Sequence, residues 1–535
     1  MLKILRSKAR LGSSIAEPCA ACDGGEPLTS AGARVSIDID KVKTFFVENF
    51  GCRATQADGA ALAREFRERG LEQAAGFSQA QIVVVNTCTV TQAADQDARA
   101  AIRRIHRANP TCRIVVTGCY AQRAPEELAA LPGVAQVIGN SHKHRLVDIV
   151  LPAANRVDPQ GWGETPARRS SDFVPVSRLA AGSNGRISDP APIFVSDIFA
   201  HTELLAPLID AARERTRPIL KVQDGCDNRC SFCVIPYVRG SSRSLPLRRI
   251  LEELNRLIAA GYREVVLSGI NLGRWGRDLP RSEFVGTTIP PERSLGLEDL
   301  VRSILTHTSL EKLRISSVEP MDWTDDLVQL VAESPRIAKH AHVPMQSGSD
   351  RILRRMHRKY RPWHYREKIQ ALRAAMPEAA IGADVMVGFP GETEHDFHET
   401  QRMVEELPFT YLHVFPFSPR PGTQAAAMRD QVSMKVAEER SRIVRQLAGE
   451  KRLAFMRSLI GKSLAAITLD TQARWEAEGA RGPTHEGSFA EALTDNYLKL
   501  WVRGEHEPNR WLKAEIEDVR DGMLIGVATS SRTNL

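Results

Sequence analysis

The chain lacks any apolar run near the roughly 20 residues that a membrane-spanning helix needs. Residues 1–10 are basic, but no apolar stretch long enough for a secretion signal follows them. Cysteine is limited to nine positions among 535 residues, and so large a chain needs no disulfides in a reducing compartment. These absences predict a cytoplasmic protein without membrane segments. The net charge of +7 is compatible with a polyanionic partner such as RNA.

A chain of 535 residues is too long for one ordinary core, so we expect about three domains. Residues 1–40 lack sustained periodicity and contain several glycines and prolines, so we expect a disordered extension. Over residues 41–152, short β-branched runs alternate with helical patterns, which is typical of a doubly wound parallel sheet. Residues 153–216 are rich in Pro, Gly, Ser and Arg, and we interpret them as a linker. The strand-like runs of the first domain lie at 44–47, 82–85 and 114–116.

A second α/β alternation over residues 217–460 predicts six strand–helix units, which make a barrel or an open partial barrel. On such folds the chemistry lies in the loops after the strands, and here these loops are polar and glycine-rich. Residues 461–530 read as short strands between polar turns and predict a small β-barrel. The candidate strands of the second domain are 219–222, 265–267, 313–316, 340–343, 381–387 and 411–415.

Cys226, Cys230 and Cys233 form a CxxxCxxC motif directly after the first of these six strands. Three thiolates on one tight loop suit a 4Fe–4S cluster that leaves one iron open. Zinc is the alternative, but it takes four ligands or three plus water, and no fourth Cys or His lies nearby in sequence. An open iron at a barrel mouth is a place for a cofactor or substrate to bind, so the motif indicates a redox enzyme.

Three further cysteines, Cys52, Cys88 and Cys119, each lie just after a predicted strand of the amino-terminal sheet. Ligands gather beyond the carboxyl ends of parallel strands, so we expect these cysteines to share a cluster. The alternative is that each is a small buried apolar residue, as free cysteines often are.

The remaining cysteines have other interpretations. Cys112 begins a strand and is interpreted as structural. Cys19 and Cys22 form a CxxC pair in the extension, which is either half of a metal site or two incidental thiols.

The CxxxCxxC loop resembles that of the radical S-adenosylmethionine superfamily, whose open iron binds the amino and carboxylate groups of that cofactor. Further motifs resemble the methylthiotransferases within it. In that family the amino-terminal cysteines hold a second 4Fe–4S cluster and an RNA-binding barrel, called TRAM, ends the chain. The resemblance therefore implies two 4Fe–4S clusters, S-adenosyl-L-methionine and a tRNA substrate. The motifs are NTCTVT at 86–91, GC at 118–119, VIP and RG within 226–240, HVPMQSGS at 342–349 and VGFPGET at 387–393.

Segments at 51–53, 87–91 and 316–320 look most like the threonylcarbamoyladenosine (MtaB-type) branch of that family. This branch adds a methylthio group to carbon 2 of N6-threonylcarbamoyladenosine beside the tRNA anticodon. The alternatives are the same chemistry on isopentenyladenosine in tRNA or on an aspartate of a ribosomal protein. An iron–sulfur sensor or RNA-binding regulator is an alternative of another class. The chain departs from the branch at Ala54, around 204–215 and in its extra residues 1–40.

The same resemblance marks candidate contacts for S-adenosylmethionine at the ends of barrel strands and beside the cluster cysteines. The strand-end residues are candidates to hold the methionine or ribose part, and the two residues beside the cysteines are candidates to flank the adenine. The alternative for each is a loop residue that satisfies local backbone groups. The strand-end residues are Gly269, Asn271, Glu319, Gln346 and Ser347, and the other two are Phe232 and Ile235.

Basic and aromatic residues provide candidate tRNA contacts. A basic run at residues 351–361 either contacts the tRNA backbone or forms a solvated helix face. Tyr360 and Trp363 either stack on a base or belong to the core. A threonylcarbamoyl group carries a carboxylate, so we expect a cation near the barrel mouth. The candidates for that cation are Arg239, Arg243, Arg274 and Arg420. We also expect a monomer that receives electrons from a donor such as flavodoxin or ferredoxin.

Overall fold

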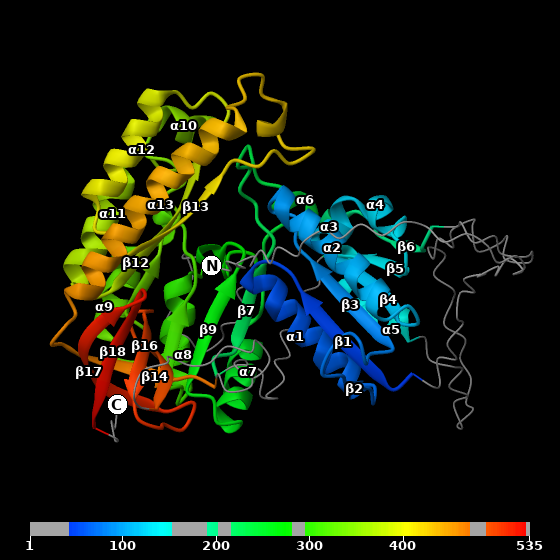
Figure 1. Cartoon of the computed structure of the whole chain (residues 1–535), viewed down its shortest axis with the longest axis horizontal. Coiled ribbons are helices and arrows are strands. Elements are labelled where there is room, and N and C mark those ends of the chain that lie inside the picture. The colour runs from blue at the N-terminus through cyan, green and yellow to red at the C-terminus, as the bar shows by residue number, and fades with distance from the viewer. Residues whose placement is uncertain (1–41, 152–189, 202–215, 281–294, 471–487, 531–535) are drawn as a thin grey trace, which may run out of the picture. The chain divides into compact units, whose positions relative to one another are not determined.

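The structure, a computed structural model, describes residues 42–151, 190–201, 216–280, 295–470 and 488–530 (Figure 1). The extension at 1–40, with Cys19 and Cys22, lies outside the described residues. Of the helices in the described ranges, none combines the length and the apolar character needed to cross a bilayer.

The amino-terminal domain is built on a six-stranded parallel sheet with the order β2-β1-β3-β4-β5-β6 (Figure 1). Every residue of β3 is buried, because helices cover both faces of the sheet. The predicted doubly wound fold of this domain is confirmed. The strands are β1 (Thr44–Asn49), β2 (Glu72–Gln73), β3 (Ile82–Thr87), β4 (Arg113–Gly118), β5 (Val134–Gly139) and β6 (Ile193–Phe194). The helices are α1 (Arg53–Glu68), α2 (Gln92–Ala108), α3 (Cys119–Arg123), α4 (Pro125–Ala129), η2 (Asn140–Arg145) and α5 (Leu146–Val150).

The alternation of side chains along β3 divides the core of this domain into two layers. Ile82 and Val84 pack with Leu62 of α1 on one face, whereas Val83 and Val85 pack with Ile102 of α2 on the other. Strand β6 comes from the segment that we interpreted as a linker. It has only two residues, so it carries no periodic signal by which the sequence could reveal it.

Six parallel strands form the central domain. Hydrogen bonds join β9 to both β7 and β10, and join β12 to both β11 and β13. A bridge between Ser317 and His342 links the two groups, which gives the predicted partial (β/α)6 barrel. Strand β8 (Arg243–Ser244) pairs antiparallel with β7. The parallel strands are β7 (Ile219–Asp224), β9 (Glu264–Gly269), β10 (Lys312–Ile315), β11 (His340–His342), β12 (Ala380–Val387) and β13 (Tyr411–Pro416).

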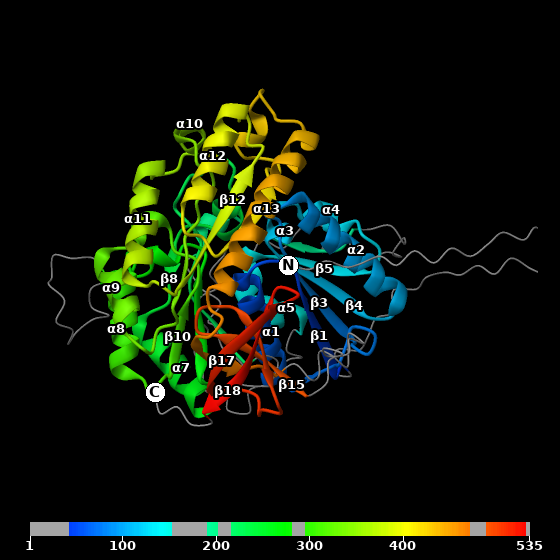
Figure 2. The same cartoon turned by 60° about the vertical axis from the view of Figure 1, so that its left-hand side comes forward.

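Helices between these strands cover the outer face of the sheet (Figures 1 and 2). In α7, Leu247, Ile250, Leu254 and Leu257 recur at helical spacing and are buried, which shows why this segment is helical and which side faces the core. The helices are η4 (Ile198–Ala200), α6 (Ile235–Arg239), α7 (Leu247–Ala259), η5 (Leu272–Arg274), α8 (Leu297–His307), η7 (Pro320–Asp322), α9 (Asp325–Glu333), α10 (Asp350–Arg355), α11 (Pro362–Ala375), α12 (Glu394–Glu406), η8 (Ala425–Ala427) and α13 (Met434–Arg457).

The predicted small carboxy-terminal barrel is confirmed as a closed barrel with the order β14-β15-β16-β18-β17. In β17, residues from Leu512 to Glu517 alternate between buried and exposed, as the strand period of two requires. Leu500, Leu512 and Leu524 meet in its core. The strands are β14 (Ser463–Thr468), β15 (Phe489–Thr494), β16 (Lys499–Arg503), β17 (Trp511–Arg520) and β18 (Met523–Ser530).

Candidate functional site

The CxxxCxxC loop begins directly after β7. Gly225 has a φ of +72°, and a Cβ atom there would lie 1.9 Å from the carbonyl oxygen of Ser241, so the turn requires glycine. The N–H of Cys226 donates to the oxygen of Gly240 at 3.0 Å, and the N–H of Cys233 donates to the oxygen of Cys230 at 3.1 Å. These bonds fold the loop back on itself and hold the three cysteines on one compact segment.

The thiols of this loop are partly shielded from water. Burial raises the pKa of Cys233 to about 12, and the neighbouring Cys230 and Cys226 raise it as well. Burial also raises the pKa of Cys226, while the side-chain N–H of Asn271 donates to its sulfur at 3.5 Å. Without metal, Cys226 and Cys233 stay protonated at neutral pH. Binding a metal displaces such protons, so the set fits a metal-bound cluster.

Arg358 is a buried cation against this loop, and the sequence placed it only as one member of the basic run. Its Nη1 donates to the sulfur of Cys230 at 3.3 Å. Its Nη2 contacts the carboxylate of Glu319, and its Nε lies 3.2 Å from the hydroxyl of Tyr360. Arg358 thus connects Cys230 to a residue that we expect to contact S-adenosylmethionine.

The other three cysteines come from three different strand ends. Cys52 precedes α1, Cys88 follows β3, and Cys119 opens α3 after β4. The parallel register, with Thr87 opposite Gly118, places these ends beside one another. Burial raises the pKa of Cys88 to about 12, and Cys119 and Cys52 lie near enough to raise it further. A Cβ atom at Gly51, whose φ is +101°, would lie 2.7 Å from the sulfur of Cys88.

Within the described ranges, no three His, Cys, Asp or Glu side chains converge as the ligands of a single metal ion do. A 4Fe–4S cluster does not require that convergence, because each thiolate binds its own iron. Both cysteine triads bring three thiols close enough together to influence one another's pKa, and both therefore fit the predicted clusters.

A buried ionic network joins the amino-terminal and central domains. Asp58 of α1 accepts from Lys143 at 3.1 Å and from Arg239 at 3.1 Å, and it contacts Lys221 of β7. Asp224, at the end of β7, accepts from Lys221 at 2.8 Å and from Arg239 at 2.9 Å. Burial alone would raise the pKa of both aspartates, but these cations hold it well below its usual value. Three cations against two carboxylates leave the network with one excess positive charge.

This excess charge lies toward the second triad. Burial lowers the pKa of Arg239, but Asp224, Cys119, Asp58 and Cys52 together outweigh burial and raise it. A buried cation of this kind suits thiolates that have lost their protons to a metal. Each cysteine triad therefore has its own buried arginine.

The four arginines that we considered for a substrate carboxylate have different surroundings. Arg239 is committed to the ionic network, and Arg243 donates to the carbonyl oxygens of His201 and Arg239. Arg420 is buried and bonds to Thr89 at 2.8 Å, as well as to Asp95. Arg274 lines an open pocket.

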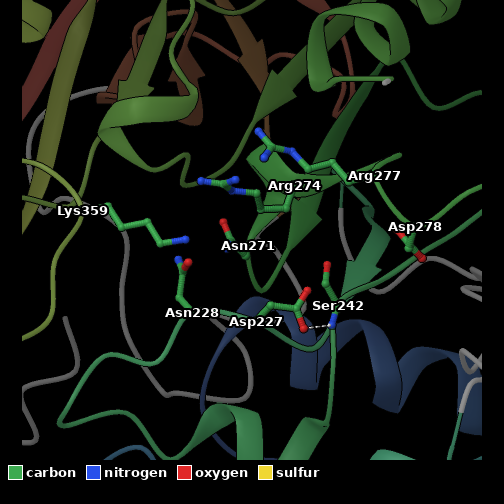
Figure 3. Close-up of a pocket in the computed structure, with 8 residues that line it drawn as sticks. All are labelled: Asp227, Asn228, Ser242, Asn271, Arg274, Arg277, Asp278 and Lys359. Atoms are coloured by element: carbon green, nitrogen blue, oxygen red, sulfur yellow. Dashed lines mark hydrogen bonds between the residues drawn. The ribbon is translucent and has the colours of Figure 1, made fainter. Parts of the chain in front are cut away.

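That pocket has a volume of about 280 Å³ and lies beside the CxxxCxxC loop (Figure 3). Its walls come from the loops after β7 and β9 and from the basic run. The lining residues are Asp227, Asn228, Ser242, Asn271, Arg274, Arg277, Asp278 and Lys359.

The expected S-adenosylmethionine contacts do not all share one environment. Gly269 ends β9 and Asn271 follows it, and Asn271 contacts the CxxxCxxC loop. Glu319 meets Arg358. Phe232 packs edge-on to Phe389, with 6.4 Å between ring centroids.

The other three candidates are tied to different neighbours. Ile235 packs with Cys119, so it faces the second triad. Gln346 is buried at a φ of +62°, and its Oε1 has no hydrogen-bond partner among the described residues. The hydroxyl of Ser347 lies 3.2 Å from that of Thr400 on α12, so this hydroxyl has a hydrogen-bond partner within the protein.

The basic run is mostly neutralised. Arg351 pairs with Asp396, Arg355 with Asp430, and both Arg354 and Arg361 with Asp350. Tyr360 is buried and donates to carbonyl oxygens of the core, whereas the Trp363 side chain is exposed. The pairing favours the helix-face interpretation for these arginines, and the burial of Tyr360 favours a core role. Lys359 forms no ion pair with any described acidic residue, although its charge acts on Asp322.

Comparison with known proteins identifies the family. Residues 44–139 match the uncharacterized protein family UPF0004, and residues 220–404 match the radical SAM superfamily. The threonylcarbamoyladenosine tRNA methylthiotransferase MtaB of Bacillus subtilis is 33% identical over 87% of this chain and 91% of its own length. The MtaB of Aquifex aeolicus is 34% identical over 88% of this chain and 99% of its own.

A relative named for a different substrate is similar too. The tRNA-2-methylthio-N(6)-dimethylallyladenosine synthase of Novosphingobium aromaticivorans is 31% identical over 79% of this chain and 86% of its own length. Among solved structures, the radical S-adenosylmethionine methyltransferase TsrM of Kitasatospora setae aligns with a TM-score of 0.46 at 16% identity, over 72% of this chain and 76% of that one. From the similarity to the two MtaB proteins along most of its length, the chain belongs to the MtaB-type methylthiotransferase family.

Proposed function

We propose that this protein is a tRNA methylthiotransferase that converts N6-threonylcarbamoyladenosine beside the anticodon into its 2-methylthio derivative. The observation that carries the proposal is the presence of two cysteine triads, one on each of two α/β domains, in a chain of this family. Its cofactors are two 4Fe–4S clusters and S-adenosyl-L-methionine.

Cys226, Cys230 and Cys233 would hold one cluster, and the cysteines at the amino-terminal strand ends, Cys52, Cys88 and Cys119, would hold the other. When bound, these cofactors supply a radical that removes hydrogen from carbon 2 of the adenine, together with the sulfur and methyl of the new group. The C–H bond at that carbon is too weakly acidic for acid–base chemistry.

The protein contributes positioning and charge to this reaction. Arg358 bonds to Cys230 and fixes Glu319, which keeps a carboxylate near the cluster loop for the amino or hydroxyl groups of S-adenosylmethionine. The side-chain N–H of Asn271 donates to the sulfur of Cys226, and the residue also lines the pocket. The buried network around Asp58 holds the two cluster-bearing domains together.

We assign the amino-terminal domain to 41–152, the radical domain to 217–460 and a TRAM-like domain to 461–530. The TRAM-like segment has twelve acidic and eight basic residues, so its own charge does not favour phosphates. Because the whole chain carries +7, the remainder carries +11, and most of the electrostatic attraction to tRNA would arise there. We place the protein in the cytoplasm as a monomer that receives electrons from a flavodoxin or ferredoxin.

A dimethylallyl substrate is the competing assignment, supported by the similarity to the Novosphingobium aromaticivorans synthase. The cations and amides of the pocket favour the threonylcarbamoyl group instead, because a dimethylallyl group is wholly apolar.

The deciding experiment offers the reconstituted, reduced enzyme two tRNA substrates, one with threonylcarbamoyladenosine and one with isopentenyladenosine. Mass spectrometry of the digested nucleosides should detect the methylthio product only, or far faster, from the first. The Cys226→Ala variant serves as the inactive control. Equal or exclusive turnover of the isopentenyl substrate would overturn the branch assignment.

A further inference from the structure

Cationic and acidic side chains line different parts of the pocket beside the CxxxCxxC loop. In Figure 3 the side-chain ends of Lys359, Arg274 and Asn271 point toward the same part of the pocket, whereas Asp278 points away from it. Asp227 lies on the other side, where it accepts from the backbone N–H of Ser242 at 3.1 Å. One side of the pocket is therefore cationic, although acidic residues also line it.

The cations on that side are only partly neutralised. Arg274 and Arg277 share one carboxylate, that of Asp322, at 3.3 Å and 3.4 Å. The Asp322 side chain is 3% exposed, so it lies behind the arginines and away from the pocket opening. Lys359 makes no hydrogen bond or ion pair with any described residue, although its charge also acts on Asp322. On this side of the pocket three cations thus share one buried acid, which leaves local positive charge for a ligand, while Asp227 and Asp278 keep their negative charge elsewhere on the pocket wall.

The acidic residues of the pocket wall are occupied. Asp278 accepts from both the backbone N–H and the hydroxyl of Ser244, at 2.8 Å and 2.5 Å. Beside the cations, Asn271 is buried, and its Oδ1 has no hydrogen-bond partner in the described structure. A buried acceptor without a partner is costly unless a ligand supplies a donor. The pocket therefore calls for a ligand that has both an anionic group and a hydrogen-bond donor.

We propose that Arg274, Arg277 and Lys359 bind the carboxylate of the threonylcarbamoyl group, and that Asn271 accepts from one of its N–H or O–H groups. This inference rests on the proposed function and names the substrate subsite within it. Because the pocket adjoins Asn228 of the cluster loop, the subsite would set the position of the modified base relative to that loop. It also explains how the enzyme would reject an isopentenyl group, which would leave these polar groups without partners.

The test variant is Arg277→Gln with Lys359→Gln, because both side chains are exposed and their loss leaves the Arg274–Asp322 pair in place. We expect kcat/KM for tRNA with threonylcarbamoyladenosine to fall about 10- to 100-fold, as charge-assisted bonds are lost. The Lys359→Arg variant, with Arg277 intact, should recover most of the rate. The matched control, Arg248→Gln with Lys435→Gln, removes the same charge from exposed positions on α7 and α13.

Two further measurements separate this subsite from other anion sites. Binding of tRNA with unmodified adenosine should be the same for the test and control variants. An equal loss of binding for both tRNAs would mean that the cations hold backbone phosphates and would overturn the inference. If cleavage of S-adenosylmethionine without tRNA falls as much as methylthiolation does, the cations belong to the site of that cofactor. That result would also overturn the inference. Failure of the proposed function differs from both, because the wild-type enzyme would then leave threonylcarbamoyladenosine unchanged.

Discussion

Cys226, Cys230 and Cys233 lie on one folded-back loop, whereas Cys52, Cys88 and Cys119 reach one another only because three parallel strands end side by side. The first triad is half-buried, while Cys88 and Cys119 of the second are buried and Cys52 is exposed. The loop depends on local turns, and the assembled triad depends on the packing of a whole domain. We therefore expect the two sites to respond differently to the same kinds of substitution.

The largest effect should follow removal of either triad. With alanine at Cys226, Cys230 and Cys233, iron should fall from about eight to about four per chain, and S-adenosylmethionine cleavage should disappear. With alanine at the amino-terminal triad, iron should also fall to about four, but some cleavage should survive while methylthiolation is lost. Iron assays and 5′-deoxyadenosine formation measure both. Full iron in the second variant would show that its cysteines hold no cluster.

The buried arginine of the loop offers a sharper perturbation. Replacing Arg358 with Gln removes the cation that contacts Cys230 and frees Glu319. We expect iron to be retained, cleavage of S-adenosylmethionine to slow about 10- to 100-fold, and the potential of this cluster to become more negative. The electron paramagnetic resonance signal of the other cluster should not change. An unchanged potential and rate would reduce Arg358 to a packing residue.

The ionic network tests how the assembled site depends on its domain. Asp58→Asn leaves three buried cations with one carboxylate, so the free energy of unfolding should fall by about 3–5 kcal/mol. Asp148→Asn, which breaks the exposed pair with Arg69, should cost about 1 kcal/mol or less. The first denaturant transition of the reconstituted protein measures both. Similar costs for the two variants would contradict a network that stabilises the assembled site.

The same network predicts a pH dependence. The pKa of Asp58 and of Asp224 is lowered in the folded protein, so both contribute stability above their unfolded pKa of about 4. This contribution is lost as the pH falls below that value and the carboxylates take up protons. The stability gap between the wild type and Asp58→Asn should be constant from pH 7 to about pH 5 and narrow at lower pH. A gap that widens on acidification would show that the aspartates are not ionised.

The smallest effect is expected at Cys112, which directly precedes β4 and belongs to neither triad. Burial raises its pKa to about 11, so it stays a neutral thiol packed among apolar side chains. Cys112→Ala should keep full iron content and activity, with a small loss of stability. Loss of several irons would identify Cys112 as a ligand.

The difference between the triads also explains what the sequence revealed. The CxxxCxxC spacing is local and was visible at once, and the alternation of strands and helices was enough to place the other cysteines at strand ends. The network around Asp58 was not visible, because its members come from four separate segments that only the tertiary fold brings together. The role of Arg358 was hidden for a related reason. Its neighbours in sequence are surface arginines, and burial alone distinguishes it.

The central claim is tested most directly by tRNA nucleosides from a strain that lacks this protein. Mass spectrometry should show threonylcarbamoyladenosine without its 2-methylthio derivative. The wild-type gene should restore the derivative, and neither triple-alanine variant should restore it. Persistence of the 2-methylthio derivative in the deletion strain, or its restoration by either variant, would contradict the account.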